Sequence, residues 1–184
     1  GENGSPLSKR HGSRSIRELR EEGVLPLALT NHLARVGHTY ESDAFMDLTQ
    51  LAAHFEITRL GRAPARHDGA QLLHWQKEAV ARMSDAELWD WMSARTYQNG
   101  RRIQDWVPVA DALRFVHTVR DNIVMPLDAY LWAGNLYAPA DAFDPDARQV
   151  IQQAGVEFFR AAQTVLTDAG ADFKVFTKQL GTTT

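Results

Sequence analysis

The sequence predicts an all-α protein, or nearly so. Apolar residues recur at intervals of three and four through most of its 184 residues, which is the period of an amphipathic helix. Helix start signals, either capping pairs or prolines suited to a first helical turn, precede most of these runs. Alternation typical of a strand is brief and confined to residues 55–60. Hydrophobic residues make up 44% of the chain, which is enough to build the core that such helices need.

The first two helices are marked at both ends. Ser15 is the predicted N-cap of a helix over residues 16–22, and Gly23 ends that helix because glycine readily adopts the left-handed conformation. Pro26 fits the first turn of a second helix, which Gly37 ends. We therefore expect two successive helices joined by a short turn.

A third helix should begin after Asp47, which forms a variant capping pair with Gln50. Residues 55–60 are expected to be extended. Residues 61–68 hold a glycine, a proline and two arginines, and they are expected to form an irregular loop.

Two more helices are predicted before residue 98. The first covers residues 71–80 and places three apolar side chains on one face: Leu72, Trp75 and Ala79. The second starts at a capping box formed by Ser84 and Glu87 and extends to Ala94.

The best candidate for a domain boundary is residues 98–102, QNGRR, because Asn-Gly favours a turn. Behind it, four further helices are predicted, over residues 108–120, 126–137, 145–167 and 172–180. The longest of them opens with Asp144 as N-cap and Pro145 in the first turn. Its apolar side consists of Val150, Ile151, Val156, Phe159, Ala162 and Leu166.

Composition excludes several classes of protein. The chain has no cysteine, so it holds neither a disulfide nor a thiolate zinc site, and its seven histidines form no convincing ligand set. We predict no metal site. No apolar run approaches the roughly 18–20 residues of a membrane span. The net charge of -3 argues against a uniformly basic nucleic-acid binder, but residues 8–20 carry five basic residues against one acid.

The five tryptophans could stack on unpaired bases, but most of them sit at helical spacing among apolar neighbours. We expect most of them to pack in the core. Trp89 and Trp91 are two residues apart and cannot share one helix face, so one of them should be partly exposed.

The most informative segment is residues 6–12, PLSKRHG. A lysine in a loop can bring a positive charge to a phosphate, and an arginine can bind a phosphate with two hydrogen bonds. Cations placed in this way stabilise a transition state that gathers charge on phosphates. A solvated basic loop is the alternative, and this segment alone does not decide between the two.

In its context, PLSKRHG resembles the ATP loop of the glutamyl-tRNA synthetases, which are class I aminoacyl-tRNA synthetases. That loop is written K-[LIM]-S-K-[RS] and is followed by E-G-[FVY]-L-P-x-A-[LIV], which residues 22–29 match in order. Residues 55–77 resemble a second segment of the family, and the matching positions are Pro64, Ala65, Asp68, Leu72 and Trp75. The resemblance is strongest over residues 6–78, and beyond residue 102 it rests on helical layout.

The resemblance implies an ATP site at Leu7, Ser8, Lys9 and Arg10. Lys9 would be catalytic in the intact enzyme, because it would stabilise the ATP phosphates while the adenylate forms, with Mg²⁺ bound to the nucleotide. Pro6 departs from the pattern, since it stands where the motif has its first lysine. The chain contains no H-[IVL]-G-H signature, so by itself it is expected to be inactive.

The resemblance also implies an order of domains. Residues 1–14 would carry the ATP loop, residues 15–97 a helical stem-contact-type domain, and residues 98–184 a helical anticodon-binding domain truncated at its C-terminal end. Six basic residues are candidates for tRNA phosphate contacts: Arg59, Arg62, Arg66, Lys77, Arg101 and Arg102. The alternative is a solvated loop, or for Arg59 an ion pair with Glu56.

The function expected from the resemblance is the tRNA-binding, C-terminal portion of a cytoplasmic ligase that attaches glutamate to tRNA(Glu) with ATP. Its partner would be tRNA(Glu), and glutamate and ATP would bind only together with a catalytic domain. Neither DNA nor a membrane is an expected partner. The rival is a non-catalytic helical module that binds protein partners through its acidic rear half.

Overall fold

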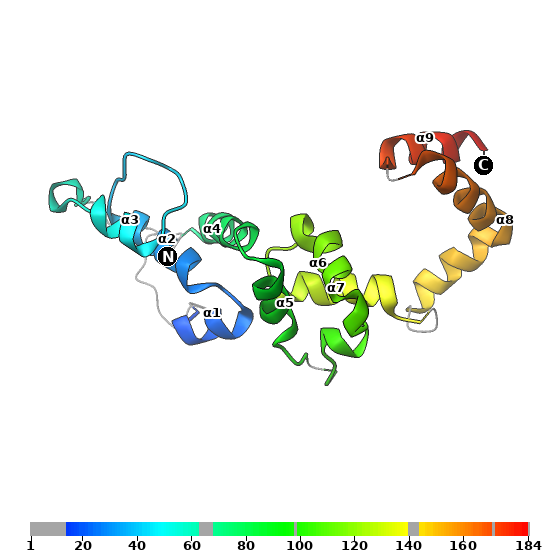
Figure 1. Ribbon diagram of the computed structural model, residues 1–184, viewed down its shortest axis with the longest axis horizontal. Helices are drawn as coiled ribbons and strands as arrows, with labels where there is room; N and C mark the ends of the chain where they lie inside the picture. The colour runs from blue at the N-terminus through cyan, green and yellow to red at the C-terminus, as the bar shows by residue number, and fades with distance from the viewer. Residues whose placement is uncertain (1–13, 63–67, 98, 140–143, 171, 184) are drawn as a thin grey trace. The chain divides into compact units, whose positions relative to one another are not determined.

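The computed structural model describes residues 14–62, 68–97, 99–139, 144–170 and 172–183. Within these ranges the regular structure is helical and contains no strand, apart from one isolated antiparallel bridge between His38 and Leu60. The predicted all-α class is confirmed. The α-helices are α1 (Ile16–Glu22), α2 (Pro26–Gly37), α3 (Leu48–Ala53), α4 (Gly69–Ala81), α5 (Asp85–Ser93), α6 (Ala112–Val119), α7 (Pro126–Tyr137), α8 (Pro145–Ala169) and α9 (Phe173–Thr183) (Figure 1).

The chain forms two compact units, Gly1–Ala138 (unit 1) and Pro139–Thr184 (unit 2). Unit 1 contains α1 to α7, and unit 2 contains α8 and α9. The boundary predicted at residues 98–102 falls inside unit 1, where buried side chains from before and after it share one core. That boundary and the domain assignments stay predictions.

Local signals end and begin the helices where the sequence places them. Ser15 Oγ accepts a hydrogen bond from the Glu18 N–H at 3.2 Å, and the Glu18 carboxylate accepts one from the Ser15 N–H at 2.5 Å. The same reciprocal pairing joins Asp47 to Gln50 and Ser84 to Glu87. Helices α2, α7 and α8 begin with the predicted first-turn prolines. These signals act within a few residues, so the sequence alone suffices to locate them.

The expectation of extended backbone over residues 55–60 is wrong at its centre, where Ile57–Arg59 forms the 3-10 turn η2. The Arg59 N–H donates to the Glu56 carbonyl at 2.9 Å, and the Leu60 N–H donates to the Ile57 carbonyl at 3.3 Å, so this turn is closed by local hydrogen bonds. Pairing with the chain opposite is limited to the bridge between Leu60 and His38 and to one hydrogen bond from the Thr39 N–H to the Arg59 carbonyl at 3.3 Å. Alternating side chains do not form a strand where no neighbouring strand is available to pair with.

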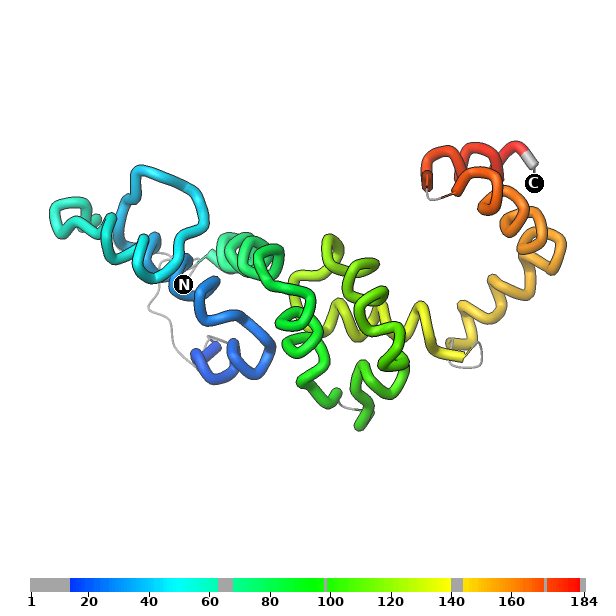
Figure 2. Tube along the Cα trace, viewed as in Figure 1, coloured from blue at the N-terminus to red at the C-terminus, as the bar shows by residue number. Residues whose placement is uncertain are grey.

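Helices α5, α6 and α7 lie side by side (Figure 2), and their side chains form most of the main core of unit 1. The 3-10 turn η3 (Ile103–Asp105) adds Ile103, and α6 is flanked by the turns η4 (Val109–Asp111) and η5 (Arg120–Asn122). The residues of this core are Val80, Leu88, Met92, Ile103, Val107, Phe115, Val116, Val119, Ile123, Ala129, Tyr130 and Ala133. Two smaller clusters centre on α1, α2 and α4: Leu19, Val24 and Leu72 in one, and Ala28, Trp75 and Ala79 in the other.

The tryptophans behave largely as expected. Trp75 is buried, and Trp89, Trp91 and Trp106 are half-buried against the main core. Trp132 is exposed. Trp89 and Trp91 are thus both partly exposed, and both pack against the main core.

Unit 2 buries little of its own surface. Helix α8 is interrupted at Gly155, where φ is 72°, and it contacts α9. Val165 is the one buried hydrophobic residue among the described residues of unit 2. The predicted apolar side of α8 is present but exposed at Val150, Ile151, Val156, Phe159 and Leu166.

The described residues contain neither a membrane-spanning helix nor a cluster of metal ligands. None of their helices is both long and apolar enough to cross a bilayer. No group of three or more His, Asp or Glu side chains in the same ranges could hold a metal ion.

Candidate nucleic-acid interface

The predicted ATP loop and one predicted tRNA contact cannot be placed. Leu7, Ser8, Lys9 and Arg10 precede the first described residue, and Arg66 lies in the gap between residues 62 and 68. Their assignments stay predictions. The other five basic candidates lie in unit 1 at three separate places.

Arg59 is neutralised by two acids. Its guanidinium lies 2.6 Å from the Glu41 carboxylate and 3.1 Å from that of Glu56. The hydrogen bonds to Glu41 and then Glu56 raise the pKa of Arg59, and the bond from Arg59 lowers the pKa of the Glu41 carboxyl. The Glu56 ion pair weighed from the sequence is thus formed. Such a pair leaves less positive charge for a phosphate.

Arg62 and Lys77 are exposed and lie on different elements. Arg62 follows Gly61, whose N–H donates to the Gly37 carbonyl at 2.9 Å and ties this segment to the end of α2. Lys77 lies on the outer side of α4, because its neighbours Trp75 and Gln76 face inward. Both cations are open to solvent.

Arg101 and Arg102 lie in a tight turn after α5. The Arg101 backbone is fixed on both sides, because its carbonyl accepts from the Tyr97 N–H at 2.9 Å and its N–H donates to Asn99 Oδ1 at 3.1 Å. Its guanidinium lies over the Trp106 ring, 5.6 Å from the centroid. The Arg102 N–H donates to the Asp105 carboxylate at 2.7 Å. The turn therefore presents two exposed arginines, and hydrogen bonds fix its backbone.

Trp106 links the turn that carries Arg101 to other aromatic side chains. Its ring centroid lies 5.3 Å from that of Tyr130, and Tyr130 stacks on Tyr97 at 3.9 Å. Asn99 Nδ2 donates to the Tyr130 hydroxyl at 2.6 Å. Trp106 packs directly on Gly134 of α7, where a Cβ atom would lie 2.0 Å from ring atom Cζ3. Because of this packing, the position of Arg101 depends on a glycine 33 residues away.

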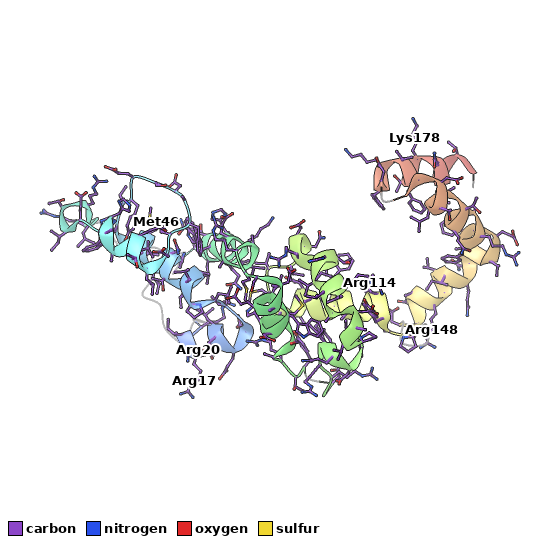
Figure 3. The ribbon with its side chains drawn as sticks, in the orientation of Figure 1. Arg17, Arg20, Met46, Arg114, Arg148 and Lys178 are labelled. Atoms are coloured by element: carbon purple, nitrogen blue, oxygen red, sulfur yellow. The ribbon has the colours of Figure 1, made fainter. Side chains whose placement is uncertain are left out.

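The residues that sequence reasoning missed are Arg20 and Arg95. Arg95 Nη2 donates to the Arg20 carbonyl at 2.7 Å and connects the end of α1 to the segment after α5. Arg20 belongs to the basic run that the sequence revealed, and its side chain projects from α1 together with that of Arg17 (Figure 3). Arg95 stands alone in the sequence, and no local pattern marks it.

The same junction is held by a buried polar contact. Gln76 Nε2 donates to the Gly23 carbonyl at 3.2 Å, and Trp91 Nε1 donates to the same oxygen at 2.9 Å. Gln76 Nε2 also lies 3.2 Å from the Val124 carbonyl, and its Oε1 accepts from the Leu25 N–H at 2.9 Å. Four segments of unit 1 therefore meet at this junction: the turn at Gly23, helix α4, helix α5 and the segment before α7.

Ion pairing divides the arginines of unit 1 into two groups. The neutralised pairs are Arg14–Glu22, Arg59–Glu41, Arg82–Glu78, Arg114–Asp111 and Arg120–Asp85. Across the described ranges, no carboxylate lies within ion-pair distance of Arg20, Arg95 or Arg101. Un-neutralised arginines on a rigid surface are the groups expected to bind phosphates.

The chain is similar along its length to curated enzymes. It is 46% identical over 184 residues to glutamate-tRNA ligase 2 of Nitrosococcus oceani, which covers 100% of the chain and 38% of the relative. It is 43% identical over 176 residues to glutamate-tRNA ligase 1 of Methylococcus capsulatus, which covers 96% of the chain and 36% of the relative. The chain thus spans little more than a third of the length of these relatives. No family model matches it.

The fold has a counterpart among solved structures. The glutamate-tRNA synthetase of Elizabethkingia anophelis superposes with a TM-score of 0.67 over 98% of the chain and 39% of the solved chain. The sequence identity is 17%, so this likeness concerns the fold alone. The curated relatives place the chain in the class of the aminoacyl-tRNA synthetases. Within that class, the chain belongs to the glutamate-tRNA ligase family.

Proposed function

We propose that the chain is the tRNA-binding, C-terminal portion of a glutamate-tRNA ligase. The observation that carries the proposal is the 46% identity to such a ligase along the whole chain. The un-neutralised arginines of unit 1 support it, because a polyanion is the ligand they suit. The intact enzyme would attach glutamate to tRNA(Glu) in the cytoplasm, and this portion would hold the tRNA so that its acceptor end reaches the reacting groups.

In this proposal the ATP loop acts only in the intact enzyme. Lys9 would stabilise the phosphates of ATP with its Mg²⁺, and Leu7, Ser8 and Arg10 would help to place the nucleotide. These assignments rest on the sequence motif. Exchange of pyrophosphate into ATP by the 184-residue chain should therefore be undetectable with glutamate and tRNA present, and a measurable rate would overturn this part of the proposal.

The direct test is a titration with tRNA. We expect a glutamate tRNA transcript to bind the chain at low ionic strength and to lose affinity steeply as salt rises, because phosphate neutralisation releases counterions. An unrelated tRNA serves as the comparison. Absence of binding to either tRNA at about 50 mM salt would refute the proposal.

The exposed apolar side of α8 favours a second candidate, a module that binds protein partners. Val150 and Val156 are each 65% exposed, which is unusual for valines on an amphipathic helix. Association with protein but not with tRNA, measured by sedimentation, would support this candidate.

A further inference from the structure

Two arginines that are 75 residues apart in the sequence meet at the surface of unit 1. Arg95 Nη2 donates to the Arg20 carbonyl at 2.7 Å. The Arg95 Nε atom also lies 3.5 Å from where a Cβ atom at Gly23 would be, so the whole guanidinium lies along the end of α1. Arg20 is exposed and Arg95 is half-exposed. The contact fixes the Arg95 guanidinium against the end of α1, the helix that carries the exposed Arg20 side chain.

We call Arg20, Arg95 and Arg101 the row of cations. Arg101 lies in the turn after α5. Tyr97 follows Arg95 by two residues in the segment after α5. Tyr97 stacks on Tyr130, which lies against Trp106, and Arg101 lies over the outer face of Trp106. The three rings therefore connect Arg101 to Tyr97, two residues from Arg95, and the Arg95 guanidinium contacts the Arg20 carbonyl.

Two acids of α1 are already engaged. The Glu18 carboxylate accepts from the Ser15 N–H, and Glu22 pairs with Arg14. Close like charges without a carboxylate between them repel one another. A bound polyanion would relieve that repulsion.

We propose that Arg20, Arg95 and Arg101 form one track that binds the sugar-phosphate backbone of tRNA. This inference rests on the proposed function and assigns it to particular residues. The guanidinium suits the role because its planar fork can donate two parallel hydrogen bonds to one phosphate. The track would recognise the charge and shape of the tRNA backbone. It would not distinguish one base sequence from another, because it contacts only phosphates.

The test uses the 184-residue chain and a fluorescent glutamate tRNA transcript. Affinity is measured at about 50 mM and about 200 mM salt for Arg20→Gln, Arg101→Gln and the triple variant in which Arg95 is also changed to Gln. We expect each single variant to weaken binding roughly three- to tenfold and to lower the salt slope by about one. The triple variant should lower the slope by about three.

Two controls separate charge from structure. Arg114→Gln removes an exposed arginine that is already paired with Asp111, and it should leave affinity and salt slope unchanged. Arg95→Lys keeps the charge and should retain most of the salt slope even if its hydrogen bond to Arg20 is weakened. Circular dichroism melting of each variant shows that the helical fold is intact.

The outcomes distinguish the two proposals. If the wild-type chain binds tRNA and the triple variant keeps its affinity and salt slope, the track is wrong while the proposed function stands. A loss of the same size in Arg114→Gln would also overturn the track, because it would reflect net charge alone. If the wild-type chain binds no tRNA at low salt, the proposed function itself fails.

Discussion

The side-chain amide of Gln76, fully buried in α4, donates to the carbonyl oxygen of Gly23 at 3.2 Å across 53 residues of sequence. Gln76 also accepts from the Leu25 N–H and lies within hydrogen-bonding distance of the Val124 carbonyl. One side chain therefore satisfies backbone groups at the turn between α1 and α2 and in the segment before α7. Buried backbone groups that lose such a partner are costly, since no water replaces it.

Replacing Gln76 by Ala should lower the free energy of unfolding by about 2–4 kcal/mol, because the Leu25 N–H and the Val124 carbonyl lose their partner and a cavity is left, while the Gly23 carbonyl keeps Trp91. Urea denaturation followed by tryptophan fluorescence measures this for unit 1, which contains all five tryptophans. Gln71→Ala, an exposed change on the same helix, is the control and should cost under about 0.5 kcal/mol. Equal effects of the two changes would show that the Gln76 contacts contribute nothing.

Gly23 combines a backbone and a packing requirement. Its φ is 107°, and a Cβ atom there would lie 2.5 Å from Cγ and Cδ of Pro126. Gly23→Ala should therefore cost about 2–5 kcal/mol, the sum of left-handed strain and overpacking. Gly100→Ala measures the left-handed strain by itself, because Gly100 has φ +76° but open space around it. This change should cost about 1–2 kcal/mol. A Gly23→Ala cost no larger than that of Gly100→Ala would show that the ring of Pro126 yields freely.

Gly134 is needed because Trp106 packs on α7. Alanine normally stabilises a helix relative to glycine by up to about 1 kcal/mol, but here Gly134→Ala should destabilise by about 1–3 kcal/mol. In a Trp106→Leu background the same change should become neutral or stabilising, which a double-mutant cycle in urea detects. Gly37→Ala, with nothing within 4 Å of its Cβ position, should not depend on that background. Persistence of the Gly134→Ala cost without the indole would contradict the packing argument.

Tyr97 should make the fold sensitive to alkali. Burial raises the pKa of Tyr97 to about 12, and its hydroxyl has no hydrogen-bond partner among the described residues. Since the unfolded tyrosine has a pKa of about 10, its contribution to stability is complete below about pH 10 and is lost as the pH rises towards about 12. Melting temperatures measured from neutral to alkaline pH should show this loss.

The variant Tyr97→Phe should remove part of that alkaline loss and change stability at neutral pH by under roughly 1 kcal/mol, because the hydroxyl is unpaired. Tyr40→Phe is the matched control. It also removes one tyrosine hydroxyl, but this hydroxyl donates to the Leu51 carbonyl at 3.3 Å. An alkaline transition that is identical in the wild type and Tyr97→Phe would assign the loss to other groups.

Helix ends and fold class were within reach of the sequence because the interactions that set them are local. The capping box at Ser15 and Glu18 and the prolines of α2, α7 and α8 involve groups within a few residues of one another. The segment PLSKRHG around Lys9 is also local, and its assignment as an ATP loop stays a prediction. Residues 55–60 escaped this reasoning, because a strand needs a partner that only the fold can supply.

For several arginines, the tertiary structure decided how much positive charge is left for a partner. Arg59 stood out in the sequence but is neutralised by Glu41, 18 residues away. Arg95 carried no signal, yet the fold brings the segment after α5 to the end of α1, where Arg95 contacts the Arg20 carbonyl. Electrostatic interactions depend on distance in space, and distance along the chain does not predict it. The sequence by itself therefore determined the family and the helices, while the fold determined which cations face solvent without a counter-charge.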